Sequence, residues 1–206
     1  MREHFHKHFL KVQPMIRKRL KEFEKFQRYG DEKLFEEMTY CVFAANSSAT
    51  MANTALKILK PILWNASLED YQKAVHKKVR FYNVRSKYLY HNREKIKELG
   101  GLKVNLEGKT PEERRDFIRK HFKGFGLKES SHFLRNIGYR GYCIVDKHVL
   151  NVMKDLEVLK TNVPPKNEKE YFKIEEEIKK FAKENYYDLD ELDLAMWSFR
   201  TGKVMR

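Results

Sequence analysis

The spacing of apolar residues restricts the fold of this chain more than any other feature. Along nearly the whole sequence these residues recur three or four positions apart, which is the spacing of one face of an α-helix. Strand patterns are nearly absent. One short apolar run lies at residues 142–145, and it is followed at once by another helical pattern. The sequence therefore predicts an all-α protein. In segment 31–45, one helical face would carry Leu34, Phe35, Met38, Cys41 and Val42.

Several segments also carry N-terminal helix signals. Residues 110–113, TPEE, combine a capping box with proline at the first helical position. Ser67 is followed three residues later by Asp70, and Asn167 precedes a segment whose acidic residues come before its basic ones. We expect a helix to begin at each of these places.

The chain has 206 residues, enough for one compact domain or for two small lobes that share a cleft. Glycines and prolines punctuate the sequence without forming a long linker, and no internal repeat is visible. We expect a single catalytic unit with two helical lobes. The middle lobe would span residues 50–145, and the second would combine residues 1–49 with residues 146–206.

Basic residues outnumber acidic ones. Forty-three Lys and Arg against 29 Asp and Glu give a net charge of +14, spread along the length of the chain. Such a surplus favours a polyanion such as nucleic acid, because each neutralised phosphate releases counterions. A solubility function and the charged surface of a thermophile are the alternatives, and the scarcity of glutamine also points to a thermophile.

The two cysteines, Cys41 and Cys143, each stand alone in an apolar run, so they cannot form a zinc or iron-sulfur site between them. We expect buried thiols, no metal and no cofactor. The N-terminus lacks the apolar run of a signal peptide, and no segment approaches the ~20 apolar residues of a membrane span. The sequence thus predicts a soluble, intracellular protein without a membrane partner.

A glycine hairpin joins two predicted helices near the middle of the chain. Residues 112–122 read as a helix that ends at a turn, and Gly124-Phe125-Gly126 then leads directly into the next helical segment. Such a turn points backbone N–H groups and the positive end of the second helix into solvent, where they can bind a phosphate. Structural turns between helices look similar, so this signal is weak by itself.

The residues around the hairpin make the signal specific. Segment 121–153, HFKGFGLKESSHFLRNIGYRGYCIVDKHVLNVM, resembles the helix-hairpin-helix DNA glycosylases, and within them the small archaeal and Thermotoga-type 8-oxoguanine DNA glycosylases. The family pattern is K-G-x-G-x-K-E-x-S-H-F-L-R-N, followed by I-x-D-[KR]-H. CVFAANSS at 41–48, VRFYNVRSK at 79–87 and LDLAMW at 192–197 extend the resemblance over most of the chain.

The resemblance implies a helix-hairpin-helix DNA glycosylase fold, with two helical lobes flanking a cleft. It also implies a bifunctional repair enzyme that flips out 8-oxoguanine, excises it through a lysine Schiff base and cleaves the strand by β-elimination. Lys128 matches the catalytic lysine of the family and Asp146 its aspartate. An attacking amine must be neutral, and burial near the positive end of a helix favours that form. The plain alternative for Asp146 is an N-cap of the helix that follows it.

The resemblance also suggests contacts to DNA. The predicted DNA-backbone contacts are Lys123, Gly124, Phe125 and Gly126; the predicted base-pocket residues are Phe81, Trp197, Arg206 and Asp193; and further contacts are predicted at Asn46, Ser47, Arg80 and His132. The family more often ends in lysine, so the contact made by that lysine's amine is in doubt at Arg206. Core packing is the alternative for Phe81 and Trp197, and helix capping is the alternative for residues 46–48.

The cysteine content places the chain in the cluster-free branch of the superfamily. The implied partner is double-stranded DNA containing 8-oxoguanine, with no obligate protein partner, a monomeric state and, in a prokaryote, a cytoplasmic location at the nucleoid. A non-catalytic helix-hairpin-helix DNA-binding protein is the main alternative, because it would need the basic surface but neither Lys128 nor Asp146. An interaction protein with a thermophile's charge is a third hypothesis.

Overall fold

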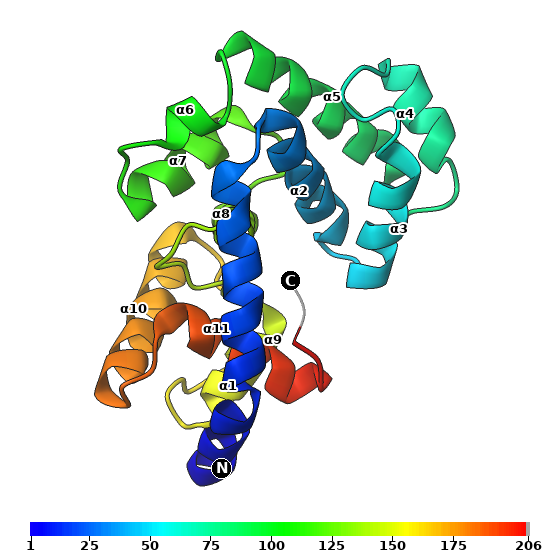
Figure 1. Cartoon of the computed structure of the whole chain (residues 1–206). Helices are drawn as coiled ribbons and strands as arrows, with labels where there is room; N and C mark the ends of the chain where they lie inside the picture. The colour runs from blue at the N-terminus through cyan, green and yellow to red at the C-terminus, as the bar shows by residue number, and fades with distance from the viewer. Residues whose placement is uncertain (205–206) are drawn as a thin grey trace. The chain divides into compact units, whose positions relative to one another are not determined.

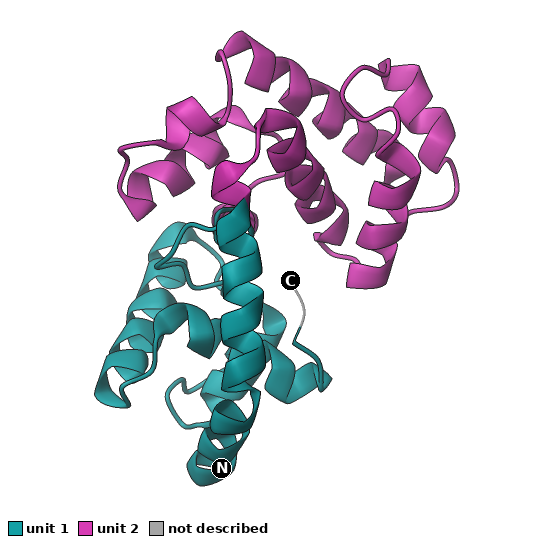
Figure 2. Cartoon of the chain, viewed as in Figure 1, with its two compact units in different colours: residues 1–25, 134–206 teal, residues 26–133 magenta. Residues whose placement is uncertain are grey.

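The computed structural model describes residues 1–204 and folds them into helices and connecting loops, with no strand among these residues. The prediction of an all-α protein is confirmed. The chain divides into two compact units, one formed by residues 26–133 and the other by residues 1–25 and 134–206 (Figure 2).

In the unit of residues 26–133, helix α2 (Asp31–Ala44) is the central element and packs against α3 (Ala49–Leu59) and α5 (Tyr82–Glu98). Phe35, Met38 and Phe43 of α2 are fully buried in its core. The shorter helices are α4 (Leu68–Val75), α6 (Lys103–Leu106) and α7 (Pro111–His121), and the 3-10 helix η1 (Lys25–Arg28) stands at the start of this unit. Figure 1 shows the order of these helices along the chain.

In the other unit, helix α11 (Leu189–Thr201) packs against the long N-terminal helix α1 (Arg2–Glu24), α9 (Lys147–Asp155) and α10 (Glu168–Glu184) (Figure 1). Residues 190–196 of α11 are all buried. A helix buried over so much of its circumference is covered by neighbours on several sides. The acidic residues within residues 190–196 therefore need partners inside the protein.

The unit boundaries differ from the predicted lobes. Residues 26–49 belong with residues 50–133, because α2 packs on α3 and α5. Residues 134–145 belong instead with the termini, and a Cβ on Gly138 would lie 2.8 Å from the carbonyl oxygen of Phe23 in α1. Helix α8 (Leu127–Asn136) therefore contributes residues to both units.

The local helix signals are confirmed. Thr110 and Ser67 each form a capping box at the start of α7 and α4, and the Asn167 side chain caps α10. Both cysteines are buried free thiols, as expected.

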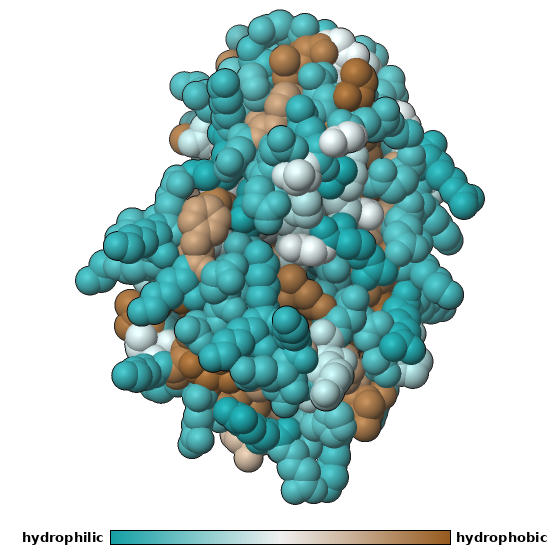
Figure 3. Space-filling view, turned by 90° about the vertical axis from the view of Figure 1, so that its left-hand side faces the viewer, coloured by the Kyte–Doolittle hydropathy of each residue, from teal (hydrophilic) through white to brown (hydrophobic). Residues whose placement is uncertain are grey.

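The face of the molecule in Figure 3 is mostly hydrophilic, with hydrophobic residues scattered singly or in small groups. Among residues 1–204, no helix combines the length and the apolar character that a membrane span requires.

Candidate active site

Lys128 lies in the first turn of α8, directly after the glycine hairpin. Its Nζ is 2.9 Å from Oε1 of Glu129, and the side chains of Lys128 and Glu129 are 35% and 18% exposed. The amine is thus only partly accessible and has a carboxylate beside it. Glu129 was not among the predicted site residues, although a glutamate directly follows the lysine in the family pattern.

The hairpin before Lys128 is fixed to α5 by one side chain. Asn92 donates from Nδ2 to the carbonyl oxygen of Lys123 at 3.0 Å and accepts from the Lys123 N–H at 2.7 Å. Gly124 has φ +86°, and a Cβ there would lie 2.9 Å from the ring of Tyr88. Glycine is therefore required at this position both for its backbone conformation and for the close approach of α5.

Phe125, at the tip of the hairpin, turns its side chain inward. The ring is 6% exposed and lies 5.8 Å from the ring of Phe133 in an edge contact. Lys123, Gly124 and Gly126 are exposed. Phe125 therefore anchors the turn, and only its main chain is suited to the predicted contact with DNA.

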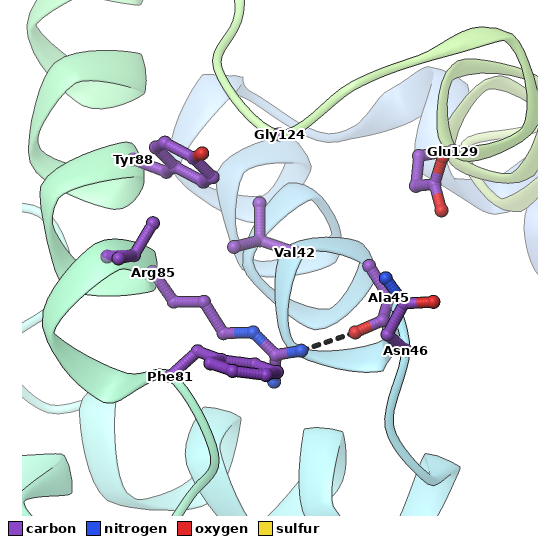
Figure 4. A pocket seen from close by; sticks show the side chains of 9 residues that line it. Val42, Ala45, Asn46, Phe81, Arg85, Tyr88, Gly124 and Glu129 are labelled. Carbon is purple, nitrogen blue, oxygen red and sulfur yellow. Dashed lines mark hydrogen bonds between the residues drawn. The ribbon is translucent and has the colours of Figure 1, made fainter.

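A cavity of about 330 Å³ opens beside the hairpin within the unit of residues 26–133. Its size lies at the lower end of the range for small-ligand pockets. Residues of α5 form one side, and Asn46 and Glu129 lie on the other (Figure 4). Because Glu129 also pairs with Lys128, the amine is bonded to a residue of the cavity wall. The cavity is lined by Val42, Ala45, Asn46, Phe81, Val84, Arg85, Tyr88, Gly124 and Glu129.

Arg85 is a cation buried in the wall of this cavity, with 5% of the residue exposed. Its guanidinium donates to the carbonyl oxygens of Phe43, at 3.0 Å, and of Ala45 (Figure 4). Burial is the main cause that lowers the pKa of Arg85, and the charge of Arg80 adds to it. Arg85 lies in the VRFYNVRSK segment of the family resemblance, but its bonds at the C-terminal end of α2 were not predicted.

Phe81, predicted as a base-pocket residue, lies in the cavity wall with an unusual backbone. It has φ +54° and is 56% exposed. The guanidinium of Arg80 lies 5.1 Å from its ring centre and that of Arg85 lies 5.6 Å from it. A bulky residue in the left-handed region is strained, and outliers of this kind cluster at functional sites. Asn46 in the same cavity also has positive φ, at +51°.

Asp146, in the other unit, is the N-cap of α9, and its Oδ1 accepts the N–H of Val149 at 2.8 Å. The capping interpretation of Asp146 is therefore confirmed. The cap uses one carboxylate oxygen and leaves Asp146 half-buried, so a second function remains compatible with it.

Asp193, predicted as a base-pocket residue, is buried and bonded within its own unit. It is 2% exposed, its Oδ2 pairs with Nη1 of Arg135, and its Oδ1 accepts the N–H of Ile144 at 3.0 Å. Both carboxylate oxygens are thus engaged inside the unit, and neither Arg135 nor this bond was expected from the sequence.

The remaining predicted contacts are spread over both units. Trp197 is half-buried on α11 and makes an edge contact with His148, at 5.9 Å between ring centres. His132 makes a similar contact with Tyr40 at 6.2 Å. Ser47 lies near Met51, and Arg206 lies outside the described residues. The helix cap expected in residues 46–48 is made by Ser48, which accepts the N–H of Met51 at 3.1 Å.

Asp190 is a buried acidic residue of α11 whose raised pKa should make the stability of the protein depend on pH. It is 3% exposed, and burial raises its pKa from 3.8 to about 6, while the bond from the Gly141 N–H opposes the shift. The folded state then binds this proton more tightly than the unfolded state between about pH 4 and pH 6. The contribution of Asp190 to the free energy of unfolding therefore falls as pH rises through that window, by about 3 kcal/mol, since each pH unit of pKa difference corresponds to ~1.36 kcal/mol.

We expect Asp190→Asn to remove this contribution, because asparagine is uncharged at every pH and still offers an oxygen to the Gly141 N–H. Urea unfolding of both proteins at pH 4.5 and pH 7 measures the effect. The variant should gain free energy of unfolding relative to the parent as pH rises; a constant difference between the two would contradict the argument.

Among residues 1–204, no group of three or more His, Cys, Asp or Glu side chains is arranged to hold a metal ion. The candidate functional groups placed by the structure are an amine, carboxylates, aromatic rings and a glycine turn. The family model for 8-oxoguanine DNA glycosylase matches residues 16–186, which cover every described element of both units except α11 and the start of α1. The chain belongs to the 8-oxoguanine DNA glycosylase family.

Named and solved members of the 8-oxoguanine DNA glycosylase family are similar over nearly their full lengths. The 8-oxoguanine DNA glycosylase/AP lyase of Thermoplasma volcanium is 37% identical, covering 93% of this chain and 92% of that protein. The crystal structure of the Thermotoga maritima 8-oxoguanine DNA glycosylase gives a TM-score of 0.87 at 30% identity, covering 99% of this chain and 97% of that one.

A Methanocaldococcus jannaschii 8-oxoguanine glycosylase/lyase has been crystallised with a 15mer DNA containing 8-oxoguanine. That structure also gives a TM-score of 0.87, at 28% identity, and covers 97% of this chain and 98% of that chain. The fold of this 8-oxoguanine DNA glycosylase family member is thus one that is known with damaged DNA bound.

Proposed function

We propose that this protein is a bifunctional DNA glycosylase and AP lyase that excises 8-oxoguanine from double-stranded DNA. The observation that carries the proposal is Lys128, held at the start of α8 directly after a glycine hairpin, in a chain whose relatives are named for this reaction. The net charge of +14 suits a DNA partner.

In the proposed reaction, neutral Lys128 attacks C1′ of the flipped nucleotide. The new N–C1′ bond replaces the glycosidic bond, and 8-oxoguanine leaves with the electron pair and takes up a proton. Opening of the sugar ring gives a protonated Schiff base, from which loss of a C2′ proton breaks the C3′–O bond of the strand. Glu129, 2.9 Å from the amine, would accept the proton that Lys128 must lose first.

Asp146 would stabilise the positive charge that develops on the sugar as the base leaves. The N–H of Val149 holds one of its oxygens, which fixes the carboxylate in one orientation. The exposed hairpin at Lys123, Gly124 and Gly126 would bind a phosphate of the DNA backbone, and the Asn92 bonds keep that turn preformed.

Base recognition is proposed for Phe81. We expect Phe81→Ala to weaken binding to a duplex containing 8-oxoguanine by about 5- to 150-fold, because stacking on an aromatic ring contributes ~1–3 kcal/mol per base. Its free energy of unfolding should change little, since the ring is 56% exposed. Fluorescence anisotropy with Lys128→Gln as the uncleaving background measures the affinity.

Tyr90→Ala is the matched control for this prediction, since Tyr90 is an exposed aromatic residue of α5, the helix that follows Phe81, and does not line the cavity. Equal losses of affinity in Phe81→Ala and Tyr90→Ala would show a general surface effect and contradict a stacking role for Phe81.

The experiment for the function itself uses a duplex with a single 8-oxoguanine, placed in turn opposite each of the four bases. Chromatography measures the released base, and denaturing gels without alkali treatment measure strand cleavage. Release and cleavage on the damaged duplex, but not on its guanine counterpart, support the proposal. Preference for uracil or alkylated purines would overturn the substrate assignment.

A non-catalytic helix-hairpin-helix DNA-binding protein is the second candidate function, supported by the same hairpin and charge. It predicts tight, salt-dependent binding with neither base release nor cleavage.

We further propose that the enzyme acts as a monomer on the chromosome of the cell, without an obligate protein partner and with side chains as its only catalytic groups. Sizing chromatography with and without DNA tests the monomer.

A further inference from the structure

The segment that leads to Asp146 is held in place by side chains of two helices. Residues 139–145 form no regular structure, yet Tyr142, Cys143, Ile144 and Val145 are all buried. Buried backbone groups need partners, and here helices α10 and α11 supply several of them. The bonds run from Gly141 N–H to Asp190 at 3.1 Å, from Ile144 N–H to Asp193 at 3.0 Å, and from the Tyr171 hydroxyl to the Cys143 carbonyl at 3.2 Å.

Asp193 also bonds a residue outside this segment. Its Oδ2 pairs with Nη1 of Arg135, which is itself 4% exposed. The Arg135 guanidinium also donates to Oδ1 of Asn136 and lies 5.6 Å from the ring centre of Phe23. Arg135 stands in the last turn of α8, the helix that begins with Leu127 and Lys128. One buried carboxylate therefore bonds both the end of α8 and the segment before Asp146.

Ile144 is close enough to Asp146 for this bond to fix its backbone. The Asp146 N–H donates to the Ile144 carbonyl at 2.7 Å, and the Asp146 side chain caps α9. Asp146 is thus restrained through Ile144 on one side and through α9 on the other. A shift of Ile144 would move the carboxylate.

Stability alone does not require an ion pair at this place. Replacing a buried ion pair by apolar residues of similar volume is often neutral or stabilising. The feature that an apolar residue cannot supply is the acceptor for the Ile144 N–H. We infer that Asp193 is a positioning residue for Asp146, acting through Ile144, rather than a contact to the flipped base. This inference rests on the proposed function.

The test uses paired substitutions, because Asp193→Asn alone would leave Arg135 as an unpaired buried charge. Arg135→Met with Asp193→Asn, the asparagine pair, removes the ion pair and keeps an acceptor for the Ile144 N–H. Arg135→Met with Asp193→Leu, the leucine pair, removes both the ion pair and the acceptor. Each pair is made in the parent and in Asp146→Asn, and single-turnover release of 8-oxoguanine is measured together with the affinity for an uncleaved duplex.

We expect the leucine pair to lose about 10²-fold in single-turnover rate, the size associated with a misplacement of about 1 Å. The asparagine pair should keep most of its rate, and neither pair should change the affinity for DNA. In the Asp146→Asn background the leucine pair should cause no further loss, because the carboxylate that it misplaces is already gone.

Three results would overturn the inference: an unchanged rate in the leucine pair, an equal loss in the Asp146→Asn background, or a loss of DNA affinity, which would return Asp193 to the base pocket. Ser67→Ala is the structural control, since it removes the N-cap of α4 in the unit of residues 26–133 and should lower stability with little effect on rate.

If the leucine pair does not fold, Tyr171→Phe removes a different restraint on the same segment without changing any charge. It should lower the single-turnover rate in the parent and leave the Asp146→Asn rate unchanged, and an equal loss in both backgrounds would count against the inference. An inactive parent protein would instead refute the proposed function, so the two failures are distinguishable.

Discussion

Lys128→Gln is expected to abolish covalent trapping of the protein on damaged DNA by sodium borohydride. Borohydride reduces a Schiff base to a stable secondary amine, and glutamine offers no nucleophilic nitrogen to form one. Glutamine is nearly as long as lysine and can still donate a hydrogen bond to Glu129, which lies 2.9 Å from Nζ in the parent. We expect base release and strand cleavage to fall on the order of 10⁵-fold, because a positioned nucleophile is lost.

The matched control is Lys120→Gln, the same substitution at an exposed lysine in the last turn of α7. It removes the same charge and should leave trapping intact. Denaturing gels with labelled DNA measure the adduct, and anisotropy shows whether Lys128→Gln still binds the duplex. A trapped adduct in Lys128→Gln would assign the nucleophile to another amine, and intact base release in it would rule out Lys128 chemistry altogether.

The features that were predictable from the sequence are those encoded by neighbouring residues. The capping boxes at Ser67 and Thr110 depend on partners three positions away, and both form as expected. Lys128 lies in the first turn of α8 because the hairpin glycines directly precede Leu127, where that helix begins. Helical spacing identifies a helix from one turn to the next, so the all-α fold needed no knowledge of long-range contacts.

The partners of buried polar groups were not predictable, because they are far apart in the chain. Asp193 pairs with Arg135 over 58 residues, and Asn92 bonds Lys123 over 31 residues. In the sequence Asp193, Arg135 and Asn92 are each one charged or polar residue within a helical pattern, with nothing to show that it faces inward. The same limit explains Arg85, whose partners are carbonyl groups at the end of α2, a type of acceptor that every residue has.

The unit boundary failed to follow the predicted lobes for a related reason. Residues 31–44 read as an amphipathic helix, but the pattern does not say which other helix covers its apolar face. The packing of α2 on α3 and α5 places it in the unit of residues 26–133. Gly138 lies against Phe23 of α1, so the chain passes into the other unit near the end of α8. An amphipathic pattern predicts which face of a helix is buried, but it does not predict which element covers that face.

Asp146 allows capping and catalysis to be separated by two substitutions at one position. Asparagine caps helices about as well as aspartate, so Asp146→Asn should keep the bond from Val149 N–H and most of the free energy of unfolding. It lacks the negative charge that would stabilise the developing positive charge on the sugar. We expect single-turnover base release to fall about 10²- to 10⁴-fold, the usual contribution of a positioned acid or base.

Asp146→Ala loses the cap as well as the charge, and should therefore unfold with about 1 kcal/mol less free energy than the parent. Its rate of base release should match that of Asp146→Asn, because the charge and not the cap is what the reaction uses. Urea unfolding and single-turnover kinetics on the same preparations give both quantities. If Asp146→Asn kept the parent rate and only Asp146→Ala lost it, then the cap would account for the whole contribution of Asp146, and the carboxylate would have no part in the chemistry.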